Sequence, residues 1–197
     1  DALPPGLTDT LEYGPGGLAV IWAEENSRDA LFAAMQRREV YGTSGTRPVV
    51  RFFGGFELPE DLCEDPALVA RGYALGVPMG GELRAPANDA PLRFAVLATK
   101  DAGSREEPGT DLERVQIVKG WLDADGATHE RVLDVAGGDT EASVDTRTCQ
   151  PHGRGHARLC AVWQDPDHHA SERAFYYARV LENPTCRWSQ HICAAKR

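Results

Sequence analysis

The chain lacks several patterns by which membrane, nucleic-acid-binding and zinc-binding proteins are identified. It has no run of about 18 apolar residues, the minimum for a helix that crosses a membrane. Acidic residues outnumber basic ones 30 to 21, so no basic surface is available for nucleic-acid phosphates. None of the five cysteines stands in a C-x-x-C pair, the strongest zinc signature. We therefore predict no membrane span and no nucleic-acid partner.

The common catalytic motifs are also missing. The sequence contains no H-E-x-x-H and no G-x-S-x-G, and its glycines form no phosphate-binding fingerprint. Residues 123–126 resemble the start of a calcium loop, but the further oxygen ligands and the closing glutamate are absent, which favours a turn. We therefore expect no catalytic residue, no metal ligand set and no cofactor in this chain. The apolar content of 42% is sufficient for a packed core.

The cysteines favour disulfides over the alternative of buried, reduced thiols. Cys149 and Cys160 flank a turn-rich segment between two extended runs, an arrangement that brings two strand ends together. Cys186 and Cys193 flank another short loop. We expect these four cysteines in disulfides and Cys63 either free or paired outside this chain. Disulfides indicate an oxidising compartment, so the expected location is periplasmic or extracellular.

Residues 1–57 have the element order of an α/β layer. The apolar run 18–22 predicts a buried strand, and a helix follows with Asn26 or Ser27 as its N-cap. A second strand is predicted over residues 49–53. One strand–helix–strand unit cannot bury both faces of a sheet. We therefore expect residues 1–57 to be the end of an α/β domain that continues upstream, with exposed apolar surface that favours a homo-oligomer.

Residues 84–197 have the pattern of a β-rich domain. The predicted strands lie over residues 92–98, 112–122, 128–135, 156–163 and 174–181. An Asp-Gly pair marks the hairpin turn between the second and third of them. Strands at this spacing fit a β-sandwich. Residues 58–83 are read as a connection, and the predicted fold class is α+β: the end of an α/β domain followed by a sandwich-like domain.

One loop has the composition of an anion site. Thr43, Ser44 and Arg47 offer two hydroxyls and a guanidinium beside two glycines that let backbone N–H groups turn toward a ligand. Glu24 and Glu25 follow the first strand, at the edge where α/β folds place ligands. The alternative is a structural loop with Arg47 paired to an acid, and a solvated pair of glutamates.

A second polar cluster has the residue types of a metal site. Asp165, Asp167, His168 and His169 offer carboxylate and imidazole ligands. Adjacent side chains in an extended loop point apart, so His168 and His169 do not converge. A polar loop between two strands is the interpretation that we favour here.

Three longer segments are recognisable as those of a known family. They are residues 22–30, residues 40–47 with 51–55, and residues 174–185 with 187–189. Together they closely resemble the carboxy-terminal region of a bacterial family known as domain of unknown function 3604. The resemblance covers nearly the whole chain. The chain departs from the family at His168 and His169, where the family usually continues with Phe and Asp.

The resemblance implies a branch of the polymerase-and-histidinol-phosphatase (PHP) metal-dependent hydrolases, often exported. In the family's order, an H-x-H and an Asp-x-His motif lie upstream of residue 1 and supply the ligands of a divalent metal. This implies the carboxy-terminal part of a hydrolase of phosphate or sulfate esters, inactive alone and partnered by the upstream PHP-like domain. The alternative is a β-sandwich that binds or supports an envelope partner without chemistry.

Overall fold

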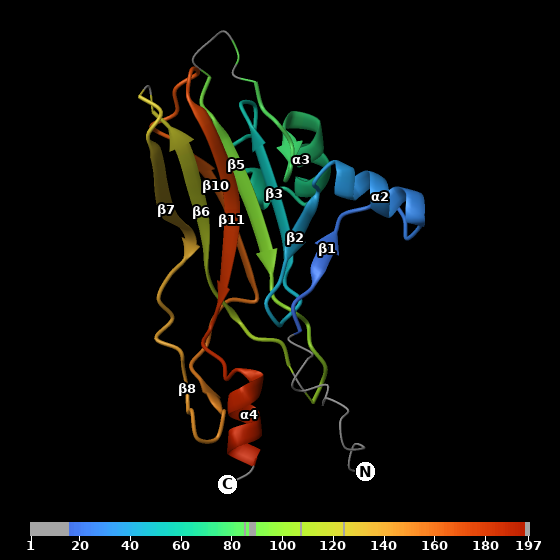
Figure 1. Cartoon of the computed structure of the whole chain (residues 1–197), viewed down its shortest axis with the longest axis vertical. Helices are drawn as coiled ribbons and strands as arrows, with labels where there is room; N and C mark the ends of the chain where they lie inside the picture. The colour runs from blue at the N-terminus through green and yellow to red at the C-terminus, as the bar shows by residue number, and fades with distance from the viewer. Residues whose placement is uncertain (1–15, 85, 87–89, 107, 124, 196–197) are drawn as a thin grey trace.

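The computed structural model describes residues 16–84, 86, 90–106, 108–123 and 125–195, and its main elements are two antiparallel β-sheets (Figure 1). The first sheet contains β3 (Val49–Gly55), β4 (Val77–Pro78), β5 (Arg93–Thr99) and β10 (Arg158–Gln164), in the order β10-β5-β3-β4. The second contains β6 (Leu112–Leu122), β7 (Thr128–Gly137) and β11 (Arg173–Glu182), in the order β11-β6-β7.

The remaining elements are short. Two strand pairs stand apart from the main sheets: β1 (Ala19–Ile21) with β2 (Val40–Gly42), and β8 (Ser143–Val144) with β9 (Pro151–His152). The helices are α2 (Arg28–Gln36), the 3-10 turn η1 (Leu62–Glu64), α3 (Leu68–Leu75) and α4 (Trp188–Ala195). Among the described residues, no helix has the length and apolar character needed to cross a membrane.

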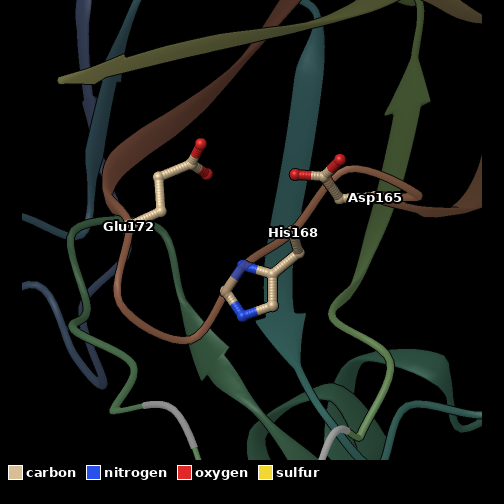
Figure 2. Close-up of side chains that lie close together, drawn as sticks. All are labelled: Asp165, His168 and Glu172. Carbon is tan, nitrogen blue, oxygen red and sulfur yellow. The ribbon is translucent and has the colours of Figure 1, made fainter. Parts of the chain in front are cut away.

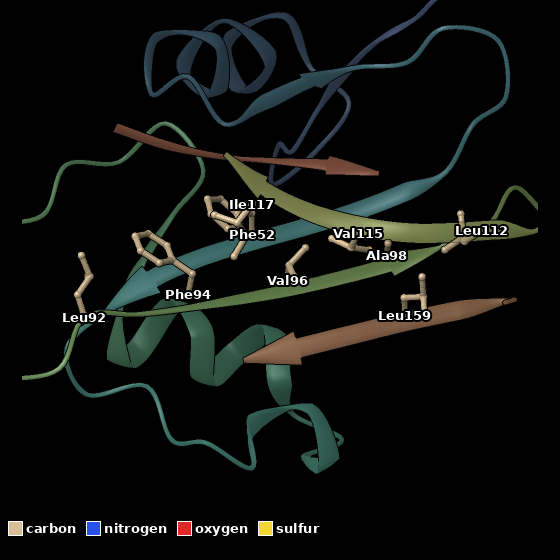
Figure 3. Close-up of a cluster of buried hydrophobic side chains, with 9 residues drawn as sticks. All are labelled: Phe52, Leu92, Phe94, Val96, Ala98, Leu112, Val115, Ile117 and Leu159. Carbon is tan, nitrogen blue, oxygen red and sulfur yellow. The ribbon is translucent and has the colours of Figure 1, made fainter. Parts of the chain in front are cut away.

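The main core lies between the two sheets (Figure 3). Side chains of a strand alternate between its two faces, so every second residue of β5 points to the same side. Phe94, Val96 and Ala98 of β5 therefore pack against Val115 and Ile117 of β6. Two antiparallel sheets that pack face to face form a β-sandwich. The predicted β-rich character is confirmed, but β3 and β4 of the first sheet precede residues 84–197, the range in which the strand spacing predicts the sandwich.

A second core covers the opposite face of the first sheet. The strand residues that alternate with those of the main core, among them Phe53 of β3 and Ala95 of β5, point to this face. They pack against Leu58, Leu62 and Leu68, which come from the segment before η1, from η1 and from α3. The molecule is therefore layered as a helical cover, a four-stranded sheet and a three-stranded sheet.

The sandwich is closed along one side and open along the other. Among the described residues, β10 of the first sheet comes close to β7 and β6 of the second, whereas β11 makes no comparable approach to β3 or β4. At the closed side, a Cβ on Gly137 of β7 would overlap the Glu113 carbonyl oxygen of β6 and lie 3.1 Å from Leu159 Cδ1 of β10, so the glycine allows a close approach there. The open side becomes important for the candidate site.

Local sequence signals are confirmed where they are strongest. Ser27 caps α2, because its Oγ accepts a hydrogen bond of 3.3 Å from the Ala30 N–H. The turn between β6 and β7 is closed by the Asp123 N–H, which donates to the Ala127 carbonyl, and Gly126 adopts a φ of 81° that suits glycine. Residue 124 in this turn, like residues 1–15, lies outside the described residues.

Residues 16–57 contain the predicted strand, helix and strand, and these strands pair antiparallel with their neighbours. The chain reverses after α2 at Arg38, which has a φ of 60°, so β2 returns antiparallel to β1. β3 then pairs with β5, which lies beyond residues 58–83. Strands from residues 1–57 and 84–197 therefore share one sheet and one core, and no part of a barrel is seen among the residues that the structure describes.

Two disulfides are present, but the expected pairing is wrong. Cys63 pairs with Cys160, with Cα atoms 5.8 Å apart, and Cys149 pairs with Cys186, with Cα atoms 5.6 Å apart. Cys193 is exposed and free. Cys160 follows the inward-facing Leu159 on β10, so it points to the other face of the sheet, toward η1. Closeness to Cys149 in sequence therefore does not bring the two sulfurs together.

Removing the longer-range disulfide is expected to destabilise the fold. The Cys63→Ala/Cys160→Ala protein should lose about 2–4 kcal/mol of unfolding free energy in urea, because a link that spans 97 residues restricts the unfolded chain. Cys193→Ser is the control and should change stability little. Non-reducing peptide mapping checks the pairing directly: a peptide that links Cys149 to Cys160 would contradict it.

Candidate functional site

A buried cluster of charges lies between the sheets at one end of the sandwich. Lys119 is on the face of β6 that also carries Val115 and Ile117, and only 3% of it is exposed. Its Nζ lies 2.8 Å from Asp165 Oδ2 and 2.7 Å from Glu172 Oε2. A buried ammonium is tolerated only when it is paired, and these two carboxylates supply the pairing.

The loop from Asp165 to Glu172 supplies the acids. It connects β10 of the first sheet to β11 of the second, so it closes the end of the sandwich. Asp165 is fixed on several sides: its Oδ1 accepts from the Asp167 N–H at 3.0 Å, and its Oδ2 accepts from the Tyr176 hydroxyl at 2.6 Å. Figure 2 shows Asp165, His168 and Glu172 gathered in this loop.

These contacts shift the ionisation of the cluster. Burial alone raises the pKa of Asp165, but the hydrogen bonds from Lys119, Tyr176 and the Asp167 N–H outweigh it and lower that pKa. Burial alone lowers the pKa of Lys119, but the bonds to Asp165 and Glu172 raise it overall. Burial and the bond to Asp165 raise the pKa of Tyr176. At neutral pH the cluster therefore contains a charged lysine, a charged aspartate and a neutral tyrosine.

The geometry does not fit a metal ion, although three metal-ligand types are close together. Asp165, His168 and Glu172 each offer one ligand atom, and these atoms lie within 4.8 Å of one another. The Lys119 ammonium already contacts both carboxylates, so a divalent ion would have to displace it or lie beside a like charge. The cation of this site is the lysine.

The other two residues of the sequence cluster face elsewhere. Asp167 pairs with Arg131 at 2.6 Å on the surface, and His169 is exposed. The segment is thus a polar loop between two strands, as the sequence favoured. Within it, only Asp165 and His168 of the four candidates come together.

Beside this cluster, a groove of about 820 Å³ runs along the open side of the sandwich. Its floor includes Phe52 and Phe94, whose rings stack with centroids 5.5 Å apart. The Tyr176 ring reaches in from β11 and lies 4.2 Å from Phe94, centroid to centroid. The opposite wall comes from β2, β4 and the segment after β4, including Val40 and Met79. The lining is therefore largely apolar and aromatic.

Two polar side chains of the loop border the groove. His168 and Glu172 both line it, and the His168 ring lies 5.8 Å from the Phe56 ring. His168 Nδ1 is buried and has no hydrogen-bond partner among the described residues. A mostly apolar groove bordered by such a polar atom has the character of a binding site.

The predicted anion loop has structural contacts instead of a free set of donors. Thr43 Oγ1 accepts from the Leu18 N–H at 3.2 Å, and the Arg47 N–H donates to Asp101 Oδ2 at 2.9 Å. Thr46 donates to Glu182. Two carboxylates next to the loop oppose a bound anion, and Ser44 is exposed beside them. Anion binding at Thr43, Ser44 and Arg47 stays a prediction.

Glu24 and Glu25 do not join that loop. In the antiparallel pair, Ile21 lies opposite Val40 and Ala19 lies opposite Gly42. The two glutamates follow the end of β1, whereas residues 43–47 follow the end of β2, so they stand at opposite ends of the pair. Both side chains are exposed.

Sequence reasoning missed Lys119, Glu172 and Tyr176. A signal existed for the first: Lys119 continues the alternation of Val115 and Ile117, which places a charge on an apolar strand face and demands buried partners. Its partner Asp165 is 46 residues away, and no local pattern connects the two.

The ionisation of Asp165 predicts a specific acid dependence of stability. Its pKa is lower in the folded protein than the unfolded value of about 3.9, so its contribution is complete above that value and lost as pH falls through the folded pKa. The stability difference between wild type and Asp165→Asn should therefore shrink below about pH 4. Urea titrations at several pH values measure it.

Asp167→Asn is the matched control, because Asp167 pairs on the surface with an exposed arginine. Its cost should be below about 1 kcal/mol at neutral pH. An Asp165→Asn cost that stays constant from neutral to strongly acidic pH would contradict the assignment.

The comparisons with known proteins agree with the resemblance in the sequence. No curated protein and no solved structure matches the chain. A family model described as "Protein of unknown function (DUF3604)" matches residues 5–196, nearly the whole length. The chain therefore belongs to this family.

Proposed function

We propose that this chain is a non-catalytic binding module that uses the groove along the open side of its β-sandwich. It serves an exported metal-dependent hydrolase of the PHP type, acting on phosphate or sulfate esters, whose metal ligands belong to an upstream domain. The observation that carries the first part is the contact of Lys119 with both Asp165 and Glu172.

Because of that contact, Asp165 is poorly suited to act as a general base or as a metal ligand. A carboxylate that acts as a general base or metal ligand must be free to take up a proton or an ion. Here Asp165 accepts from Lys119, Tyr176 and a backbone N–H. Its lowered pKa makes it a weak base. The cluster therefore holds the β10–β11 loop in place.

The groove beside the cluster has the features of a binding site. It is lined by aromatic rings from both sheets and bordered by His168, whose Nδ1 is available to a ligand. The hydrolase part of the proposal is supported only by the resemblance of the longer segments to the family. The two disulfides fit an oxidising environment, which supports export to the periplasm or the cell exterior.

The test compares this chain with the full-length gene product. Purified without chelator, this chain should hold less than about one-tenth of an equivalent of zinc or manganese and should not hydrolyse aryl phosphate or sulfate esters. The full-length product should bind metal and hydrolyse one of these esters. A full equivalent of metal in this chain, lost in Asp165→Asn and in His168→Ala, would contradict the proposal.

A further inference from the structure

The edge of β11 that borders the groove is an unpaired strand edge. β11 pairs only with β6 among the described strands, so the N–H and C=O groups on its other side have no sheet partner. The groove is lined by consecutive residues from Ala174 to Ala178, which point to both faces of the sheet. The groove therefore follows the backbone of β11 itself.

The two edge strands of the second sheet, β7 and β11, differ in their content of charged residues. β7, at the other edge, carries the charged residues Glu130, Arg131 and Asp134, the usual protection of an exposed edge. β11 has no charge from Ala174 to Ala178, and its Phe175 and Tyr177 are 61% and 44% exposed. Their rings stack on the outer face with centroids 6.4 Å apart. An edge with this composition favours pairing with another strand.

We propose that the groove binds an extended segment of a partner polypeptide as a fourth strand beside β11. Alternate side chains of that segment would enter the groove over Phe52 and Phe94, and its backbone would complete the hydrogen bonding of β11. This inference rests on the proposed function, because it names the class of partner for the same groove.

The charges around β11 define the outer face of the partner. Arg173 and Arg179 are exposed, and they flank Phe175 and Tyr177 on the outer face of the second sheet, opposite the face that packs on the core. Opposite charges on facing strands stabilise pairing. The segment that fits is therefore apolar at alternate positions and acidic near both ends of its outer face.

The opposite wall argues for a single strand over a second copy of this chain. β2, β4 and residues 79–83 face β11 across the groove. Antiparallel pairing of two β11 strands about a two-fold axis would bring both of these walls to the same side of the joined sheet, next to the shared edge. A flexible segment brings no such wall.

The probe is a blocked nine-residue peptide with a glutamate at each end and valine alternating with threonine between them, so that both glutamates and the threonines lie on the face opposite the valines. Two further versions of the peptide carry N-methyl groups, one on its odd-numbered residues and the other on its even-numbered residues. Only one of these two sets of N–H groups faces β11 and donates to it. Methylation of that set should therefore weaken binding at least about tenfold, whereas methylation of the other set should change it little. Calorimetry measures affinity, and amide exchange should become slower at alternate residues of β11.

A matched pair of protein variants locates the binding. Val40 lines the groove and is 37% exposed, whereas Val132 is 44% exposed on β7, away from the groove. Val40→Lys should weaken the probe about threefold to tenfold through lost apolar contact, and Val132→Lys should not. Circular dichroism confirms that both variants fold.

If both methylated peptides bind equally weakly and Val40→Lys still weakens the probe, strand addition is wrong but the groove remains a binding site. If Val40→Lys leaves binding unchanged, or if the unmodified probe does not bind at millimolar concentration, both strand addition and the groove as a binding site are wrong. Sedimentation that shows a dimer broken by Tyr177→Pro would assign the edge to a second copy and overturn the partner proposed here.

Discussion

The ammonium of Lys119 is the constraint on which this end of the molecule depends. A lysine on the inner face of a sandwich strand must find anionic partners, because an unpaired buried charge costs several kcal/mol. Both partners come from the loop that connects β10 to β11, so the pairing ties the two sheets together at that point. It also fixes the start of β11 and, through Asp165, the hydroxyl of Tyr176, whose ring reaches into the groove.

The same interaction gives the polar cluster a structural role and not a metal-binding one. Carboxylate and imidazole groups within 4.8 Å of one another have the composition of a metal site. Here, however, the Lys119 ammonium contacts the carboxylates in the position that a metal ion would need. The polar cluster is therefore a support, and the neighbouring groove is the surface that is left for function. A sandwich closed at β7 and β10 but open at β11 offers that surface without any change in its core.

The sequence predicted what is local and missed what is distant. The Ser27 cap, the hairpin closed around Gly126 and the strands of the sandwich follow from patterns within a few residues. The disulfide pairing was wrong because it assumed that Cys160 pairs with a neighbour in sequence, whereas the alternation along β10 turns it toward Cys63. The site was incomplete for the same reason, since Lys119 and Asp165 meet only when the two sheets pack.

The structural role of Lys119 is tested most directly by an NMR titration of its side chain in protein labelled with ¹³C and ¹⁵N, with the resonance assigned by its loss in Lys119→Met. The Lys119 pKa should lie above the ordinary value of about 10.4, and its ammonium protons should exchange slowly with water and contact Asp165. A neutral Lys119 at pH about 7, or an ammonium in fast exchange with water, would contradict it and return Asp165, His168 and Glu172 to the class of metal ligands.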